Sequence, residues 1–194
     1  MAVNSAGIAL GTAAPDFDLP ISNPWVDEHK TETRSLSLYQ GPLVVVFTCN
    51  HCPYAIHIQD PLVEVAQAYM AKGIHFVAIS SNDPVTYPAD SFDNMATRAK
   101  DVQFPFPYLF DEPQEVAKAY KAACTPDLFV FDKDHTLIYS GRFDETRPGR
   151  GTAHGGDLKR VLDSLLSGDA PINEQLPSVG CSIKWKPGNA PAYF

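Results

Sequence analysis

The segment Leu43-Val-Val-Val-Phe-Thr-Cys-Asn-His-Cys-Pro53 contains the clearest structural signal of this 194-residue sequence. Its first five residues, 43–47, are apolar and mostly β-branched, which is typical of a central strand buried on both faces. From about residue 53 to 72 the apolar residues recur at helical spacing, and Gly73 favours the end of a helix there. We therefore predict a buried strand and a helix, joined by a turn that contains two cysteines.

The rest of the chain predicts an α/β fold. Residues 74–79 form a second buried strand after the helix, which implies a parallel pair with a right-handed crossover. Residues 128–131 and 136–139 are two segments with the residue alternation of strands. A short turn separates them, so we expect them to form an antiparallel hairpin. Together these elements predict a central mixed β-sheet flanked by helices. Further elements are expected at 17–19 (a short edge strand), 90–100 (a helix capped by Asp90 or Ser91), 104–110 (a strand or extended connector), 111–121 (a helix capped by Asp111) and 156–166 (a helix).

The length and composition fit one domain. The chain is 44% hydrophobic and 20% charged, which is enough apolar material for a sizeable core. We expect a single domain over residues 1–194, with an N-terminal extension and a core at about 11–167. The Pro/Gly-rich C-terminal tail, residues 168–194, is expected to pack on that core.

The charge of the chain excludes some classes of partner. Fifteen Lys and Arg residues against 23 Asp and Glu residues give a net charge of -8, without the clustered cations that neutralise nucleic-acid phosphates. No stretch approaches the roughly 18 apolar residues of a membrane-spanning helix. Residues 1–10 lack the basic residues of a secretory signal. We therefore expect no nucleic-acid or membrane partner and a cytoplasmic location.

Two of the four cysteines form a Cys-x-x-Cys motif at the start of the predicted helix. Unpaired N–H groups and the macrodipole at a helix N-terminus stabilise a thiolate. Cys49 lies at the exposed end and is the expected nucleophile, while Cys52, one turn further in, is the expected resolving thiol. His51 is expected to stabilise the Cys49 thiolate further. A stabilised thiolate makes a disulfide easier to reduce, so an oxidising pair is predicted.

Four separated segments together resemble a known family. They are Phe47-Thr-Cys-Asn-His-Cys-Pro-Tyr54, Ile79-Ser-Ser-Asn-Asp-Pro84, Cys124-Thr-Pro-Asp127 and Gly180-Cys-Ser-Ile-Lys-Trp185. The family is the peroxiredoxin-like branch of the thioredoxin superfamily, related to the alkyl hydroperoxide reductase and thiol-specific antioxidant (AhpC/TSA) group. The resemblance covers nearly the whole chain and implies a thioredoxin-like fold with thiol-based oxidoreductase or antioxidant activity.

The resemblance also implies roles for Thr125 and Pro126. In thioredoxin folds this position holds a cis proline, whose preceding residue faces the reactive cysteine. The Thr125 backbone would then pair with an extended segment of a substrate. The full peroxiredoxin pattern Pro-x-x-x-Thr-x-x-Cys is absent, because Thr48 directly precedes Cys49 instead of standing three residues before it. Peroxide reduction is therefore a secondary expectation.

Two further cysteines are candidates for auxiliary thiols. Cys124 directly precedes Thr125 and is expected near the reactive pair. Cys181 lies in the tail, where it is either a second resolving thiol that folds back onto the site or a buried apolar residue.

Three polar residues are candidates for supporting the thiols. Thr48 precedes Cys49, and Asn82 follows the second buried strand at the same end of the sheet. Arg142 follows the second hairpin strand. It either leans toward the thiols or pairs at the surface with Asp144 or Glu145.

Three functions remain open on this reasoning. The first is a thiol–disulfide oxidoreductase in which Cys49 attacks and Cys52 resolves, with Cys181 or Cys124 as a relay. The second is a thiol-dependent peroxidase in which a cysteine becomes a sulfenic acid. The third is a Cu(I)- or zinc-binding protein that uses Cys49, Cys52 and either His51 or Cys181. An oxidoreductase would need a protein or small-molecule thiol or disulfide substrate and an electron donor, with no cofactor or metal.

Overall fold

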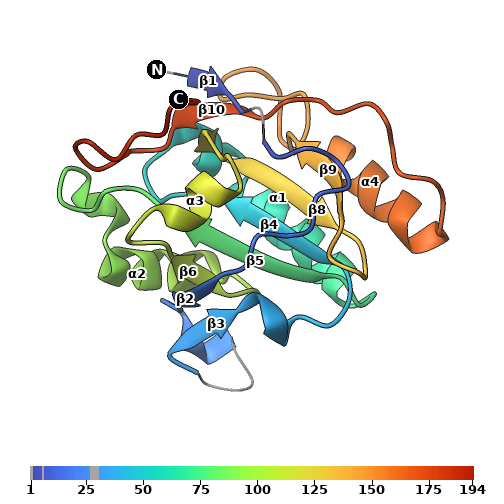
Figure 1. Cartoon of the computed structure of the whole chain (residues 1–194), viewed down its shortest axis with the longest axis horizontal. Helices are drawn as coiled ribbons and strands as arrows, with labels where there is room; N and C mark the ends of the chain where they lie inside the picture. The colour runs from blue at the N-terminus through green and yellow to red at the C-terminus, as the bar shows by residue number, and fades with distance from the viewer. Residues whose placement is uncertain (1, 6, 27–30) are drawn as a thin grey trace.

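A mixed β-sheet lies at the centre of the computed structural model, which describes residues 2–5, 7–26 and 31–194 (Figure 1). Its five strands have the order β6-β5-β4-β8-β9. The central strand β4 (Leu43–Phe47) is buried at every residue, and it pairs parallel with β5 (His75–Ser80) and antiparallel with β8 (Asp127–Phe131). The outer strands are β6 (Tyr108–Phe110), parallel to β5, and β9 (Leu137–Gly141), antiparallel to β8. The predicted central mixed sheet is confirmed.

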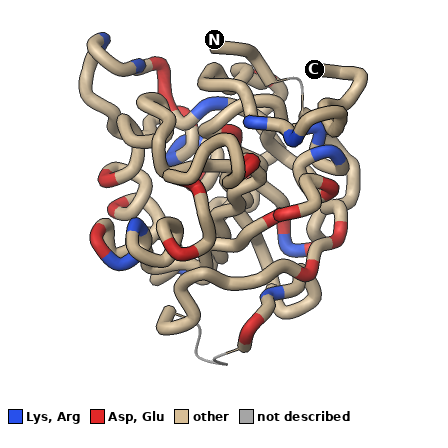
Figure 2. The backbone as a smooth tube through the Cα atoms, turned by 90° about the vertical axis from the view of Figure 1, so that its left-hand side faces the viewer, with Lys and Arg blue, Asp and Glu red and all other residues tan. Residues whose placement is uncertain are grey.

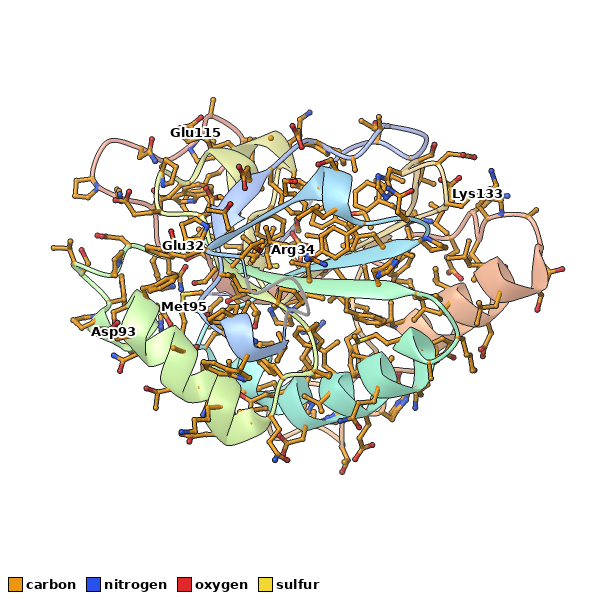
Figure 3. The ribbon with its side chains drawn as sticks, turned by 90° about the horizontal axis from the view of Figure 1, so that it is seen from below. Glu32, Arg34, Asp93, Met95, Glu115 and Lys133 are labelled. Carbon is orange, nitrogen blue, oxygen red and sulfur yellow. The ribbon has the colours of Figure 1, made fainter. Side chains whose placement is uncertain are left out.

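Helices cover both faces of this sheet. On one face α1 (Pro53–Met70), α2 (Phe92–Val102) and α4 (Gly156–Ser167) contribute apolar side chains to one buried cluster. On α2, Met95 belongs to this cluster, whereas Asp93 is exposed on the outside of the helix (Figure 3). The other face is covered by α3 (Glu115–Ala119) and the N-terminal segment, and α3 lies on the viewer's side in Figure 1.

The starts of α2 and α3 can be compared with the prediction. The N-cap of α2 is Ser91, one of the two predicted residues, whose hydroxyl accepts from the Asn94 N–H at 3.4 Å, so Asp90 is free for another role. Helix α3 begins later than expected, with Gln114 as its N-cap residue. Asp111 still accepts hydrogen bonds from N–H groups of the first turn, at residues 116 and 117. An acidic residue near a helix start therefore indicates the helix but not its first residue.

The tail contains a strand that the sequence did not predict. Strand β10 (Val179–Ser182) lies between β1 (Ala2–Asn4) and β7 (Cys124–Thr125) in a small antiparallel sheet. Both ends of the chain therefore lie close together beside this sheet (Figure 1).

The remaining elements are the paired strands β2 (Asp18–Pro20) and β3 (Thr33–Ser35), and the short 3-10 helices η1 (Pro24–Val26), η2 (Leu36–Leu38) and η3 (Pro88–Asp90).

Charges are spread over the chain without a marked division. Figure 2 shows Lys and Arg residues interspersed with Asp and Glu residues along the backbone. Within the described part of the chain, every helix is too short or too polar to cross a membrane.

Gly180 allows β10 to approach β7 closely. A Cβ atom at this position would lie 2.0 Å from the Thr125 carbonyl oxygen, which belongs to the backbone and cannot turn away. We expect Gly180→Ala to lower the free energy of unfolding by about 1–3 kcal/mol, the usual cost of overpacking. Chemical denaturation of the purified variant measures this loss. Ser182→Ala on the same strand is the control, and equal stability of the two variants would contradict the assignment.

Candidate active site

The two cysteines of the motif lie where the chain passes from β4 to α1. The N–H of Thr48 donates to the Ile79 carbonyl at 2.9 Å, which extends the pairing of β4 with β5 by one residue. Cys52 is the N-cap residue of α1, and Pro53 occupies the first helical position. The Cys49 residue is 6% exposed, whereas Cys52 is 0% exposed. Cys49 is thus the less buried residue of the pair.

Three thiols are in contact at this junction. The Cys49 and Cys52 side chains belong to one small buried cluster, and the Cys181 side chain packs against it. The Cys49 Sγ also lies 3.4 Å from the Thr125 Oγ1, and the Cys52 thiol donates to the Thr125 carbonyl at 3.1 Å. All four cysteines are reduced in the structure. The predicted pair and the tail cysteine therefore form one cluster.

The pKa order of the pair is the reverse of the prediction. The pKa of Cys52 is lowered to about 4, first by the hydrogen bond from Cys49 and, against the effect of burial, by hydrogen bonds that include the Ala55 N–H. The pKa of Cys49 is raised by its hydrogen bond to Cys52, by burial and by the negative charge of Asp90. The physical reason is that neighbouring side chains stabilise the negative charge of Cys52, whereas burial and the negative charge of Asp90 disfavour a charge on Cys49.

Asp90 organises the turn that contains the motif, and the sequence reasoning missed this role. Its carboxylate is fully buried and accepts from the Asn50 N–H at 2.8 Å and the Asn82 Nδ2 at 2.7 Å. The His51 Nδ1 lies 2.6 Å from the same carboxylate, and the His51 ring stacks on Tyr87 at 5.2 Å between centroids. His51 is thus engaged by Asp90 rather than by the Cys49 sulfur. The sequence offered no signal, because an acidic residue before a Ser N-cap is ordinary.

Cys49, His51 and Asp90 also form a group that could hold a metal ion. One ligand atom from each lies within 4.8 Å of the others, and sulfur, imidazole and carboxylate are all zinc ligands. This set differs from the predicted one because the thiol of Cys52 faces Thr125 and Cys181. Both oxygens of Asp90 already accept hydrogen bonds, so a metal ion would have to displace one of them.

Thr125 and Pro126 lie beside the pair, and the peptide bond between them is cis. The predicted pairing of the Thr125 backbone with a substrate strand stays a prediction. One edge of β7 is paired within the chain by β10, in which Cys181 is the partner of Thr125 and Ser182 is the partner of Cys124. The chain itself therefore supplies one strand next to Thr125.

The structure places the other predicted residues, Asn82, Cys124 and Arg142, in different surroundings. Asn82 is part of the site, since it binds Asp90 and its Oδ1 accepts from the Lys184 N–H at 2.8 Å. Cys124 is fully buried, and its thiol donates to the Pro126 carbonyl at 3.6 Å. Arg142 binds neither the thiols nor its predicted surface partners. Its Nε donates to Asp157 at 2.7 Å, because α4 brings that carboxylate against the end of β9.

Comparison with known proteins agrees with this arrangement. The sequence profile of the AhpC/TSA family matches residues 10–140. The chain belongs to the AhpC/TSA family. No protein with a curated description matches it. Among solved structures, this AhpC/TSA chain is 46% identical to an uncharacterised conserved protein from Geobacillus kaustophilus, with a TM-score of 0.91 over 97% of this chain and 98% of that chain. A hypothetical protein from Sinorhizobium meliloti is 39% identical, with a TM-score of 0.89 over 95% and 99%.

More distant structures share the fold of this AhpC/TSA protein. The peroxidoxin BcpB from Mycobacterium tuberculosis is 19% identical, with a TM-score of 0.59 over 82% of this chain and 97% of that chain. A secreted disulfide oxidoreductase from the same organism is 16% identical, with a TM-score of 0.58 over 77% and 96%. These likenesses establish the thioredoxin-like fold. Together with the AhpC/TSA family, they support a redox enzyme at this coarse level.

The charge of Asp90 should control the reactivity of Cys49. Because Asp90 raises the pKa of Cys49, we expect Asp90→Asn to lower it, so that more Cys49 is thiolate at any given pH. Alkylation of Cys49 by iodoacetamide, followed by mass spectrometry across the pH range of thiol titration, should then show a lower midpoint.

The control for this experiment is Asp93→Asn, which removes an exposed carboxylate from α2. It should leave the midpoint of Cys49 alkylation where it is in the unaltered protein. A midpoint that stays constant or rises in Asp90→Asn would contradict the electrostatic role of Asp90.

Proposed function

We propose that this protein is a thiol–disulfide oxidoreductase whose redox couple is Cys49 and Cys52. The observation that carries the proposal is the packing of the two cysteine side chains against each other, in a pair of which Cys49 is the less buried residue. Thiols in contact need little movement to form a disulfide. The less buried Cys49 is then the residue that a partner thiol would attack.

The electrostatics of the pair favour the oxidising direction. A substrate thiolate attacks the Cys49 Sγ, the Cys49–Cys52 bond breaks, and Cys52 leaves as a thiolate. The low pKa of Cys52 makes it a good leaving group. A second substrate thiolate then attacks the substrate sulfur of the mixed disulfide and releases Cys49, which takes up a proton. The products are a substrate disulfide and the reduced dithiol.

The surroundings of His51 offer space for a substrate. A hollow of about 420 Å³ is lined in part by Tyr87, whose ring stacks on His51, and by Lys184, Trp185 and Phe194. Tyr87 connects this hollow to His51 of the motif, and the aromatic and cationic lining suits the part of a thiol or disulfide substrate that surrounds its sulfur atoms. The substrate class proposed is therefore a protein or small-molecule dithiol or disulfide, with a separate electron acceptor or donor that completes the cycle.

The reduction potential tests the dithiol couple directly. In a glutathione titration with mass-spectrometric mapping of each thiol, we expect one two-electron transition for Cys49 and Cys52. Its midpoint should lie between about -270 and -120 mV and toward the oxidising end, because a stabilised thiolate favours the reduced form. Cys49→Ser should abolish the Cys49–Cys52 disulfide, while Cys124→Ala should leave its midpoint unchanged. Failure of the Cys49–Cys52 disulfide to form would refute the proposal.

Family membership makes peroxide reduction the second candidate. Here Cys49 would attack a peroxide, become a sulfenic acid and condense with Cys52, with release of water. The raised pKa of Cys49 keeps it largely protonated, so we expect slow peroxide consumption. A peroxide-consumption assay on the reduced protein measures this rate. Fast consumption that persists in Cys52→Ser but is lost in Cys49→Ser would assign the peroxidase activity instead.

A further inference from the structure

The C-terminal strand β10 forms part of the candidate active site, because it pairs with β7 and its Cys181 packs against the two cysteines of the motif. Its residue Cys181 lies opposite Thr125, the residue whose carbonyl and hydroxyl contact the two sulfurs of the motif. Strand β10 reaches this position because Gly180 has no side chain to collide with the Thr125 carbonyl. A thiol of the chain itself therefore occupies the edge beside the redox pair.

Several hydrogen bonds fix β10 in this place. The Ile183 N–H donates to the Ala123 carbonyl at 3.0 Å, and the Lys184 N–H donates to the Asn82 Oδ1 at 2.8 Å. The Lys184 carbonyl in turn accepts from the Asp83 N–H at 2.8 Å. These bonds join the end of the strand to Ala123, just before β7, and to the loop after β5 that contains Asn82 and Asp83. Cys181 is therefore held at the site by backbone hydrogen bonds on both sides.

Of the two remaining cysteines, only Cys181 is placed to react with the pair. Its side chain packs against the cluster of Cys49 and Cys52, it lies opposite Thr125, and the residue is partly exposed. Cys124 is fully buried, its thiol donates to a backbone carbonyl, and its pKa is raised by burial and by the charge of Asp127. The two thiols that the sequence left as equal candidates are thus distinguished by their contacts.

We propose that Cys181 is a third redox-active thiol that exchanges with the Cys49–Cys52 disulfide. The Cys181 thiolate attacks the Cys52 Sγ, the Cys49–Cys52 bond breaks, and the electron pair passes to the Cys49 Sγ, which takes the proton that Cys181 has lost. The product is a Cys52–Cys181 disulfide with a free Cys49 thiol. The exchange is an isomerisation and needs no oxidant beyond the one that formed the first disulfide. This inference rests on the proposed dithiol function.

The charges at the site allow the exchange only after oxidation. In the reduced protein the pKa of Cys181 is raised to about 11, first by burial and then by the hydrogen bond and negative charge of Cys52. Formation of the Cys49–Cys52 disulfide removes the Cys52 charge, while Lys184 continues to lower the pKa of Cys181. Cys181 thus becomes a better nucleophile when there is a disulfide to attack.

The exchange has a consequence for the catalytic cycle. A Cys49–Cys52 disulfide offers solvent only the small exposed part of Cys49, whereas a Cys52–Cys181 disulfide ends at a partly exposed residue on the protein surface. It also restores a free Cys49 thiol while the protein is still oxidised. Cys181 would therefore connect the buried pair with the electron donor or acceptor that completes the cycle.

Disulfide mapping of the full-length protein tests this proposal. Wild type and the variants Cys49→Ser, Cys181→Ser and Cys124→Ala are oxidised with oxidised glutathione, quenched with acid and alkylated. They are then digested at low pH for mass spectrometry. We expect both the Cys49–Cys52 and the Cys52–Cys181 peptides in wild type and in Cys124→Ala. We expect the Cys49–Cys52 peptide alone in Cys181→Ser and the Cys52–Cys181 peptide alone in Cys49→Ser.

The outcomes separate the relay from the underlying dithiol function. If Cys49–Cys52 forms but no variant yields Cys52–Cys181, the relay is refuted and the dithiol function stands. If Cys52–Cys181 forms while Cys49–Cys52 is absent throughout, the dithiol function is refuted and, with it, the exchange. Circular dichroism of each variant, compared with wild type, establishes that the thiols are mapped in folded protein.

Discussion

The buried carboxylate of Asp90 connects the segments that make up the active site. It accepts hydrogen bonds from the backbone at Asn50 and from the side chain of Asn82, and it engages the imidazole of His51. Asn82 extends the connection to β10 through the Lys184 N–H. A buried carboxylate is tolerated only when its oxygens have partners, so these segments depend on one another. The position of the Cys49 sulfur follows from this network.

The two sulfurs of the motif have different properties because they meet different surroundings. Neighbouring side chains stabilise a negative charge on Cys52, while Cys49 lies beside Asp90 and is slightly less buried. Cys49 is therefore the more accessible residue of the two, and Cys52 is the more acidic. Such a division suits a couple that is attacked at one sulfur and releases the other as a thiolate.

The C-terminal strand completes the site outside the part of the chain that the family profile covers. The profile matches residues 10–140, whereas Cys181 and its strand follow α4. The two solved structures with 46% and 39% identity extend over 97% and 95% of this chain, so they include this region. A third thiol beside Cys49 and Cys52 is thus a feature of the chain beyond the part that the AhpC/TSA profile covers.

The sequence alone determined β4, α1 and β5 and placed Cys49 and Cys52 at their junction, because apolar periodicity and a helix start are local signals. Only the tertiary structure decided the roles of Asp90 and of Cys181. Asp90 looks like a helix cap in sequence, and its partners lie on loops distant along the chain. Strand β10 has only four residues in a Pro/Gly-rich tail, and it exists because its backbone pairs with β1 and β7. The pKa order of the two cysteines likewise depends on which side chains neighbour Cys52 and which carboxylate lies near Cys49, and both follow from packing rather than spacing.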